Sequence, residues 1–468
     1  MAKQSIFDVI VIGSGSAGFS AVEAARAVGA RVCLIEKGKL GGECPNEACV
    51  PSKALLHAAT MYRRAQIGRD RGIEIDELSF NFSGVMAYKD RVVARITGGG
   101  ERGERYEQML KQLKVVVKFG EAKFVDAHRV EVGAEIFEGR AVVIAAGATD
   151  VVPPIDGCDR ARAWQWRDAM VATRLPKSMA IIGGGPVGCE LATFFSTFGT
   201  RVVLIESSAA VLDREDAQVS AYALAALARL GVEVVLEGIV EEIVSAHGTH
   251  GVRVRGHDSL YAVEQIVLAA GKRPNIGTLN LRATGVRLDG RGRFTTAADQ
   301  RTNVRHIFAA GDVDGGMMFT HTAHHEGAIA GYNAAIIALG KRAKSVKRDE
   351  RVVPRVTFLD PEVASVGMTQ QEVKEKFGSA LVGRFELAGL GRSATVGVQV
   401  GFVKLVAHPK TRKLLGAHMI GERAGEVIHE AALAIYLNAP VDKIASMIHA
   451  YPTFSEALRA AAVDAHLE

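Results

Sequence analysis

Two cysteines that lie close together in the chain are the residues best suited to carry chemistry. Cys44 and Cys49 are separated by four residues in the segment GGECPNEACVPSKALLHAA (41–59). Cys49 lies just ahead of a predicted helix that has Pro51 in its first turn. A thiol near a helix N-terminus has a stabilised thiolate and a lowered pKa. The segment therefore indicates a redox-active thiol pair, and the spacer permits a disulfide if the backbone bends.

Metal binding and inert packing are the two weaker interpretations of this pair. A zinc site needs about four nitrogen or sulfur ligands, and no matching pair of cysteines or histidines is evident, so we expect no metal site. Five cysteines in a long chain without a secretion signal also argue against a structural disulfide framework. The other three are predicted to be packing residues: Cys33, Cys158 and Cys189.

The elements around these cysteines include an internal repeat. Residues 6–36 (IFDVIVIGSGSAGFSAVEAARAVGARVCLIE) and 176–206 (PKSMAIIGGGPVGCELATFFSTFGTRVVLIE) have the same plan. Each reads as a short apolar strand, a glycine-rich turn, a helix and a second apolar strand that ends in Glu. The first glycine precedes that Glu by 23 residues in both copies. Two matches with equal spacing predict two dinucleotide-binding βαβ units.

The glycines of each repeat have a physical role. Gly13, Gly15 and Gly18 form G-x-G-x-x-G, which allows a tight turn, lets a pyrophosphate approach the backbone and lets helix and strand pack closely. The helix N-terminus then faces the phosphates, and Glu36 can accept hydrogen bonds from a ribose. The second unit repeats this arrangement with Gly183, Gly185, Gly188 and Glu206.

Glu206 also predicts which nicotinamide dinucleotide is used. A carboxylate at this position can bind two ribose hydroxyls but repels a 2′-phosphate. No Arg or Lys follows in the next residues, ESSAAVLD (206–213). We therefore predict that NADH is preferred over NADPH.

Three further apolar strands stop at small residues: VIAAG (143–147), VLAAG (267–271) and IFAAGD (307–312). These endings suggest a backbone that passes close to something bulky.

After about residue 346 the glycine turns stop. Alternating segments at 355–360 and 402–408 predict strands, and 426–439 predicts a helix. The expected fold class is α/β, with two Rossmann-type dinucleotide-binding domains and a C-terminal α+β domain.

Length and charge exclude other classes of protein. A chain of 468 residues predicts two to four domains. Its net charge of +5 is weak for this length, and a nucleic-acid binder would show clustered basic residues. No apolar run is long enough to span a membrane, and MAKQSIFDVIVIG lacks the features of a secretory signal. We expect a cytoplasmic enzyme that binds neither nucleic acid nor membranes.

The block GG-x-C-x4-C-x-P-S-K, both glycine motifs and IFAAGD together resemble the pyridine nucleotide–disulfide oxidoreductases. This family includes dihydrolipoamide dehydrogenase, glutathione reductase and mercuric reductase, and the resemblance covers nearly the whole chain. With the repeat, it implies an FAD domain (1–150 and 277–345), an NAD(P)-binding domain (151–276) and a C-terminal dimerisation domain (346–468). It also implies a homodimer in which each active site uses residues of both chains.

The resemblance implies roles for individual residues. Cys49 would be the thiolate next to the flavin, and Cys44 the interchange thiol that attacks the substrate. Lys53 and Glu190 match the family's ion pair beside the flavin, which gates nicotinamide entry and tunes flavin N5. The residues expected to contact FAD are Gly13, Gly15, Gly18, Glu36, Lys37, Gly42, Lys53, Ala146, Gly147 and Asp312. Those expected to contact NAD are Gly183, Gly185, Gly188, Glu206 and Gly271.

One departure from the family's pattern lies in the segment IHAYPTFSEAL (448–458). In the disulfide-reducing branches a His precedes Pro-Thr directly and exchanges protons with the substrate thiol, and a Glu follows five residues later. Here Tyr451 stands in place of that His, Glu456 is retained, and His449 lies two residues earlier. A tyrosine hydroxyl with a pKa near 10 is a poor base at pH 7. Tyr451 could act as a hydrogen-bond donor or acid, and His449 is an alternative base if the loop register shifts.

A tyrosine in this place also resembles mercuric reductase. That enzyme, however, ends in a further cysteine pair that receives the metal, whereas this sequence ends in AAAVDAHLE. The resemblance therefore leaves the acceptor open.

Three hypotheses follow. The leading one is an NADH-dependent flavoprotein like dihydrolipoamide dehydrogenase, in which the Cys44–Cys49 pair reduces a small disulfide, a lipoyl group or a thiophilic metal ion. The second is a mercuric reductase-like metal-ion or quinone reductase that uses Tyr451 and passes electrons directly from the flavin. The third is a non-enzymatic redox sensor or structural subunit that binds FAD and a partner protein.

Overall fold

The computed structural model describes residues 6–246, 248–398 and 400–468. The chain divides into two compact units. Unit 1 comprises Met1–Ala54, Met86–Val151 and Gly271–Arg348, and unit 2 comprises Leu55–Val85, Val152–Ala270 and Asp349–Glu468. None of the helices in the described residues is long and apolar enough to cross a membrane. The domain boundaries expected from the sequence stay predictions.

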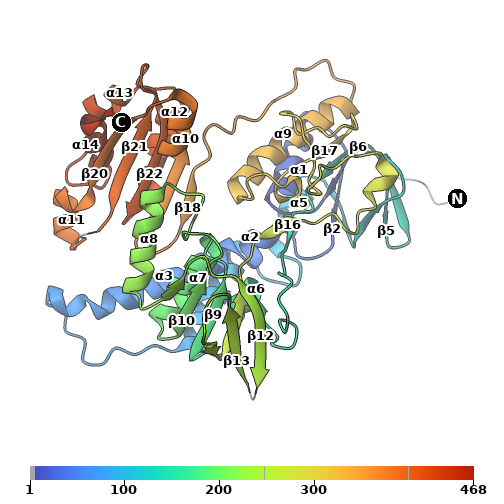
Figure 1. The fold of residues 1–468 in the computed structure, drawn as a ribbon. Coiled ribbons are helices and arrows are strands. Elements are labelled where there is room, and N and C mark those ends of the chain that lie inside the picture. Colours follow the sequence, from blue (N-terminus) through green and yellow to red (C-terminus); the bar gives the residue numbers. More distant parts are fainter. Residues whose placement is uncertain (1–5, 247, 399) are drawn as a thin grey trace. The chain divides into compact units, whose positions relative to one another are not determined.

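Unit 1 is built on a seven-stranded sheet in the order β3-β2-β1-β6-β5-β4, with β17 paired to β6 (Figure 1). Its strands are β1 (Ile6–Ile12), β2 (Val32–Glu36), β3 (Val116–Phe119), β4 (Ala122–Phe124), β5 (Arg129–Val132), β6 (Glu135–Ile144) and β17 (Ile307–Ala309). β1, β2, β3, β6 and β17 pair in parallel. Two more strands, β7 (Ala148–Asp150) and β16 (Lys272–Pro274), form a separate antiparallel pair. The first predicted βαβ unit is confirmed as β1, α1 (Ser16–Val28) and β2.

A close helix pair covers one face of this sheet. α1 packs against α9 (Thr320–Ala338), and Figure 1 shows the two side by side. A Cβ on Gly327 or Gly331 of α9 would lie 2.1 Å from the carbonyl oxygen of Ala17 or Ala21. Only glycine permits this approach, so α9 is held directly against the helix that begins at the first glycine motif. The remaining elements of this part of the chain include α2 (Glu43–Asn46), α5 (Glu104–Gln112), η2 (Leu281–Thr284) and η3 (Asp312–Asp314).

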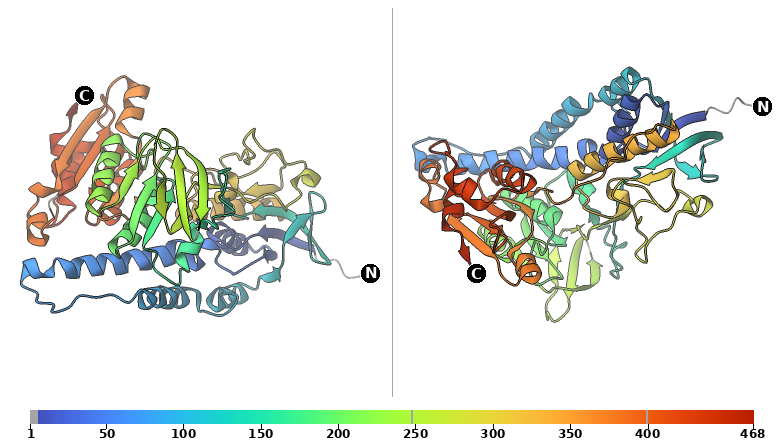
Figure 2. Two further views of the ribbon diagram at one scale, coloured as in Figure 1. Left: turned by 60° about the horizontal axis from the view of Figure 1, so that its bottom comes forward. Right: turned by 90° about the horizontal axis from the view of Figure 1, so that it is seen from above.

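Two helices, α3 (Cys49–Gln66) and α4 (Phe82–Thr97), each run through a boundary between the units. Figure 2 shows α3 as one continuous helix. The helix predicted just after Cys49 is therefore confirmed, and Cys49 is its first residue. η1 (Gly68–Arg71) lies between the two helices.

Unit 2 contains the second predicted βαβ unit. It consists of β9 (Ser178–Ile182), α7 (Pro186–Thr197) and β10 (Arg201–Ile205), in a five-stranded parallel sheet of order β11-β10-β9-β15-β8. The other strands are β8 (Trp164–Gln165), β11 (Glu233–Val235) and β15 (Gln265–Leu268). Beside it in the chain lie a three-stranded antiparallel sheet, β12 (Val240–Ala246), β13 (Thr249–Val254) and β14 (Tyr261–Val263), and the helices α6 (Trp166–Met170) and α8 (Ala217–Arg229).

The C-terminal part of unit 2 is a six-stranded sheet of order β18-β19-β22-β21-β20-β23. Its strands are β18 (Arg355–Thr357), β19 (Glu362–Gly367), β20 (Leu381–Glu386), β21 (Phe402–Ala407), β22 (Leu414–Gly421) and β23 (His466–Leu467). One face shares an apolar core with α12 (Ala424–Tyr436), α13 (Val441–Ser446) and α14 (Glu456–Asp464), as Figure 1 shows. The strands predicted at 355–360 and 402–408 and the helix predicted at 426–439 are thus confirmed. α10 (Gln370–Phe377), η4 (Leu387–Gly389) and α11 (Gly391–Val396) complete this part.

The small residues that end two of the apolar strands lie close to the glycine turns, and their expected approach to something bulky stays a prediction. A Cβ on Gly13 would lie 2.2 Å from the carbonyl oxygen of Ala145, and one on Gly183 would lie 2.4 Å from that of Ala269. The close neighbour of each strand end is therefore the backbone of a glycine turn. This contact is possible because the glycine of each turn has no side chain.

Candidate active site

The two cysteines of the predicted redox pair contact each other in unit 1. Cys44 lies in α2 and Cys49 begins α3, and their side chains form a hydrogen bond. The turn between them is held by Asn46, whose Nδ2 donates to the carbonyl oxygens of Leu40 and Gly42 at 3.0 and 2.8 Å. Both cysteines are half-buried free thiols. The structure brings the predicted pair together, and its redox role stays a prediction.

The surroundings of this pair raise the pKa of Cys44. The hydrogen bond to Cys49, burial and the charge of Cys49 raise the pKa of Cys44, against the lowering effects of Thr320 and the Lys53 ammonium. Cys49 Sγ lies 3.3 Å from Thr320 Oγ1 at the start of α9. The pKa of Cys44 is therefore held above its ordinary value.

A cradle made only of backbone lies next to the cysteine segment. A Cβ on Gly42 would be 2.5 Å from the Cα of Gly15, and Gly42 has a φ of +68°. α1 begins beside it, at Ser16, and its N-cap Gly15 provides no side-chain cap. Uncapped N–H groups at a helix N-terminus, approached only by glycine, fit the pyrophosphate of a dinucleotide such as FAD. Side chains at these two glycines would fill the cradle.

Glu36 lies at the end of β2, where the sequence predicts ribose binding. Its Oε2 accepts hydrogen bonds from the N–H and hydroxyl of Ser14 at 2.8 and 2.7 Å, and its Oε1 accepts from the N–H of Gly38 at 2.7 Å. The carboxylate is thus oriented and still has acceptor capacity for two hydroxyl groups. Lys37, which follows it, is exposed.

Asp312 lies in a partly buried charged cluster. Burial raises the pKa of its carboxyl group, the charges of Glu43 and Asp314 add to this effect, and Lys272 opposes it. Lys272 forms an ion pair with Glu43, the residue next to Cys44. Neither Glu43 nor Lys272 could be assigned to this cluster from the sequence. No local pattern identifies a pair separated by 229 residues.

Three other residues predicted to contact FAD or NAD follow the ends of β6 and β15: Ala146, Gly147 and Gly271. Asn275 donates from its side chain to the Ala146 carbonyl at 3.2 Å and from its backbone to the Gly147 carbonyl at 3.0 Å. Gly271 accepts a backbone hydrogen bond from Val151 at 2.9 Å. Gly147 and Gly271 have φ angles of +70° and +100°, which favour glycine. These residues shape the backbone, and their contacts with FAD or NAD stay predictions.

The second glycine turn repeats the geometry of the first. Glu206 Oε2 accepts from the N–H of Gly184 at 2.5 Å, and Oε1 accepts from the N–H of Ser208 at 2.7 Å. Burial would raise the pKa of Glu206, but these hydrogen bonds and those from the serine hydroxyls lower it below its ordinary value. α7 begins without a side-chain cap on Gly185, where an added Cβ would meet nothing within 4 Å. An ionised carboxylate and an open helix N-terminus therefore face the same turn.

The predicted ion pair consists of Lys53, which belongs to unit 1, and Glu190, which belongs to unit 2. Lys53 lies on α3 and acts electrostatically on Cys44. Glu190 lies on α7, is 8% exposed, and accepts a hydrogen bond from the N–H of Phe358 at 3.0 Å. Their ion pair stays a prediction.

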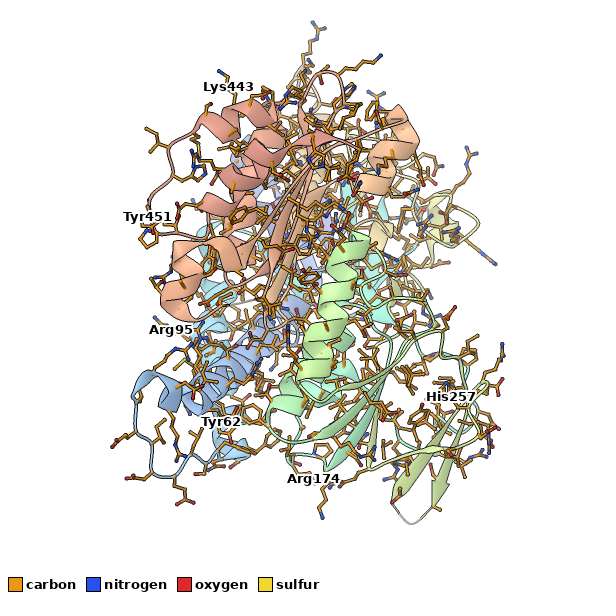
Figure 3. All side chains as sticks on the ribbon, turned by 60° about the vertical axis from the view of Figure 1, so that its left-hand side comes forward. Tyr62, Arg95, Arg174, His257, Lys443 and Tyr451 are labelled. Carbon is orange, nitrogen blue, oxygen red and sulfur yellow. The ribbon has the colours of Figure 1, made fainter. Side chains whose placement is uncertain are left out.

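The C-terminal segment places its three predicted residues in different environments. Tyr451 is 77% exposed, and Figure 3 shows it projecting from the edge of the C-terminal part. The His449 side chain is only 3% exposed, and its Nε2 lies 2.8 Å from Glu430 Oε1. Glu456 accepts a hydrogen bond from the N–H of Thr453 at 3.0 Å. Tyr451 is thus exposed, while His449 is held by Glu430.

A surface cavity of about 420 Å³ lies beside Tyr451. It is lined by Arg392, Arg423 and the turn 452–455, among others. A Cβ on Gly391 would lie 2.5 Å from the Tyr451 hydroxyl oxygen, which places that hydroxyl next to the cavity's Arg392.

The sequence matches two family descriptions. "Pyridine nucleotide-disulphide oxidoreductase" matches residues 7–327, and the dimerisation domain of the same family matches residues 353–462. Together the two matches cover both glycine motifs, the cysteine pair and the segment that contains Tyr451.

Curated proteins and a solved structure are similar over almost the whole chain. A mercuric reductase of Staphylococcus aureus is 32% identical over 460 residues, which are 98% of this chain and 82% of that protein. A dihydrolipoyl dehydrogenase of Geobacillus stearothermophilus is 33% identical over 470 residues, 97% of this chain and 96% of that protein. The Cu(II) complex of the HOCl-induced flavoprotein disulfide reductase RclA from Escherichia coli has a TM-score of 0.85 at 26% identity, covering 98% and 99% of the two chains.

Proposed function

The chain belongs to the pyridine nucleotide-disulphide oxidoreductase family, and from this premise we propose that it passes electrons from NADH through FAD and the Cys44–Cys49 pair to a sulfur-reactive acceptor. The family consists of NAD(P)H-dependent flavoprotein enzymes, which confirms the enzymatic interpretation over the redox sensor. The single observation that carries the proposal is the contact between the two thiols at the start of α3.

The raised pKa of Cys44 and the position of Cys49 at the start of α3 support a division of labour within the pair. When bound, FAD would carry two electrons between the nicotinamide and the disulfide. Cys49 would hold the negative charge at the helix N-terminus, while Cys44 keeps its proton until it attacks the acceptor. The net reaction consumes NADH, one proton and an acceptor disulfide, and yields NAD⁺ and two thiols.

Apolar side chains on the C-terminal part support a homodimer. Leu433 and Tyr436 of α12 are each 58% exposed, Leu437 at its C-cap is 64% exposed, and Ile448 is 96% exposed. Exposed apolar side chains of this density mark protein–protein contacts. In the proposed dimer, the Tyr451 segment of one chain would complete the acceptor site of its partner.

A second candidate function is the reduction of a metal ion or quinone. The exposed Tyr451, with His449 held by Glu430, favours it, because the segment presents no imidazole base to a thiol. The two candidates differ in whether electrons pass through Cys44.

An acceptor panel under anaerobic NADH tests the proposed function. We expect lipoamide, oxidised glutathione, Hg(II) or Cu(II) to support turnover at least about 10-fold faster than a quinone. NADH consumption should be matched by thiol formation with the disulfide acceptors. A quinone that is reduced fastest would support the second candidate instead, and so would turnover with Hg(II) or Cu(II) that is fully retained in Cys44→Ser.

The choice of nucleotide is tested separately. We expect kcat/KM for NADH to exceed that for NADPH by about 10-fold or more, because the ionised Glu206 repels a 2′-phosphate. Glu206→Ala should lower this ratio by raising activity with NADPH, while flavin content serves as the control for folding. A wild-type ratio of one or less would contradict the prediction.

A further inference from the structure

A buried ion pair in unit 2 joins the segment that follows Glu206 to the C-terminal sheet. Lys404 Nζ, on β21, lies 3.0 and 2.9 Å from the two carboxylate oxygens of Asp216. Both side chains are 4% exposed. Asp216 is also the N-cap of α8, because its side chain accepts from the N–H of Gln218 at 3.1 Å. A buried charge pair is costly unless each charge is held by good hydrogen bonds, so this contact defines the position of Asp216 closely.

The neighbouring residue Glu215 is held by the same sheet. Arg355, on β18, donates to its two oxygens at 3.1 and 3.3 Å. The hydroxyl of Ser365, on β19, donates to Glu215 as well. Two consecutive carboxylates at the start of α8 are thus bound by three strands of the C-terminal sheet.

These sheet residues point away from the apolar core under α12 and α14. Lys404 alternates with the core residues Val403 and Leu405, and Ser365 alternates with Ala364 and Val366. His418 on β22 is fully buried on the same face, where burial lowers the pKa of its imidazole and keeps it neutral beside the charged pair. Figure 3 shows α8, in green, against this sheet.

The other end of the segment contacts the second glycine turn. The N–H of Leu212 donates to the carbonyl oxygen of Gly184 at 2.9 Å, and the N–H of Gly184 donates to Glu206. Leu212 is 3% exposed with a φ of +50°, and its own carbonyl accepts from the Ser220 hydroxyl of α8 at 3.0 Å. The N–H and the carbonyl oxygen of Gly184 therefore both form hydrogen bonds with residues of one short segment, 206–212.

We propose that Lys404 and Asp216 are positioning residues for the pyridine nucleotide: by anchoring segment 207–216 on the C-terminal sheet, they hold the Gly184 turn and Glu206 in the geometry that binds it. This inference rests on the proposed function, in which the second βαβ unit takes up NADH. A loop already ordered before binding does not have to be ordered by the ligand, so preorganisation raises affinity without any direct contact.

The alternative is that the pair serves only to pack α8 onto the sheet. Packing alone would affect the stability of the protein and leave nucleotide affinity unchanged. The two roles are therefore separated by measuring affinity and stability on the same variants.

The test uses the FAD-loaded protein with the double variant Lys404→Met/Asp216→Asn. Removing both charges avoids an unpaired buried charge, and asparagine keeps the N-cap of α8. We expect the Kd of ADP-ribose, measured by calorimetry, to rise about 10-fold, ~1.4 kcal/mol. KM for NADH should rise similarly, with kcat at saturating NADH and FAD content within about two-fold of wild type.

The matched control removes another ion pair of the C-terminal part. Arg412 and Asp442 lie 2.7 Å apart and do not contact segment 207–216, so Arg412→Met/Asp442→Asn should leave the Kd unchanged. Ser220→Ala removes only the hydrogen bond to the Leu212 carbonyl and should raise the Kd of ADP-ribose about three-fold. This variant tests the positioning role if the double variant does not fold. A lowered Tm with unchanged Kd in the double variant, or an unchanged Kd in Ser220→Ala, would overturn the inference. Wild-type protein that fails to bind ADP-ribose in competition with NADH would instead overturn the proposed function.

Discussion

Cys44→Ser is expected to lower turnover with a disulfide acceptor by at least about 1000-fold, because a serine hydroxyl is far less acidic and less nucleophilic than a thiol. NADH should still bleach the flavin anaerobically at a rate within about two-fold of wild type, since that step precedes the use of Cys44 in the proposed sequence. Stopped-flow absorbance measures the flavin step, and steady-state turnover with lipoamide or oxidised glutathione measures the complete reaction.

The matched control for this substitution is Cys158→Ser. Cys158 is also a free cysteine, it lies outside the redox segment, and it is predicted to act only in packing. Full retention of turnover by Cys44→Ser with the preferred acceptor would exclude the dithiol pathway and leave direct electron transfer from the flavin. Loss of activity in both variants would point to a general effect on folding, which the flavin content of each preparation reports.

Tyr451→His is expected to raise lipoamide turnover by about 10-fold or more, within the range of a well-placed general acid–base group. An imidazole titrates near neutrality and can both accept and donate the thiol proton. The retained Glu456 lies five residues away, in the relation that accompanies the catalytic His in the disulfide-reducing branches. The pH profile of kcat/KM should gain a titration near neutral pH.

Tyr261→His is the matched control, because Tyr261 lies half-buried on β14, outside the C-terminal part and its exposed apolar side chains. It should leave lipoamide turnover unchanged. An unchanged rate in Tyr451→His would show that the missing base does not limit the reaction, and would shift the assignment toward a metal ion or quinone.

Local sequence patterns were sufficient to predict the two βαβ units. Gly13 and Gly183 each precede a Glu by the same number of residues, and the structure places both pairs at equivalent turns. The match is close because glycine turns and strand–helix spacing are properties of short segments. The Cys44–Cys49 pair is predictable for the same reason, since the bend between the two cysteines is set within the segment 40–49 by Asn46 and the glycines before it.

Contacts between distant segments could not be predicted in this way. The pairing of His449 with Glu430, which leaves Tyr451 exposed, has no signal in the segment IHAYPTFSEAL. Thr320 beside Cys49 and Lys272 beside Glu43 are likewise brought in from other parts of the chain.

By itself, the sequence determined the two dinucleotide turns, the thiol pair and the departure at Tyr451, because each depends on residue types at short spacing. The tertiary structure alone decided that Lys404 meets Asp216 and that Thr320 meets Cys49. The physical reason is that a side chain's charge, hydrogen bonds and pKa depend on what surrounds it, and those neighbours are set by the packing of helices and sheets far apart in the chain.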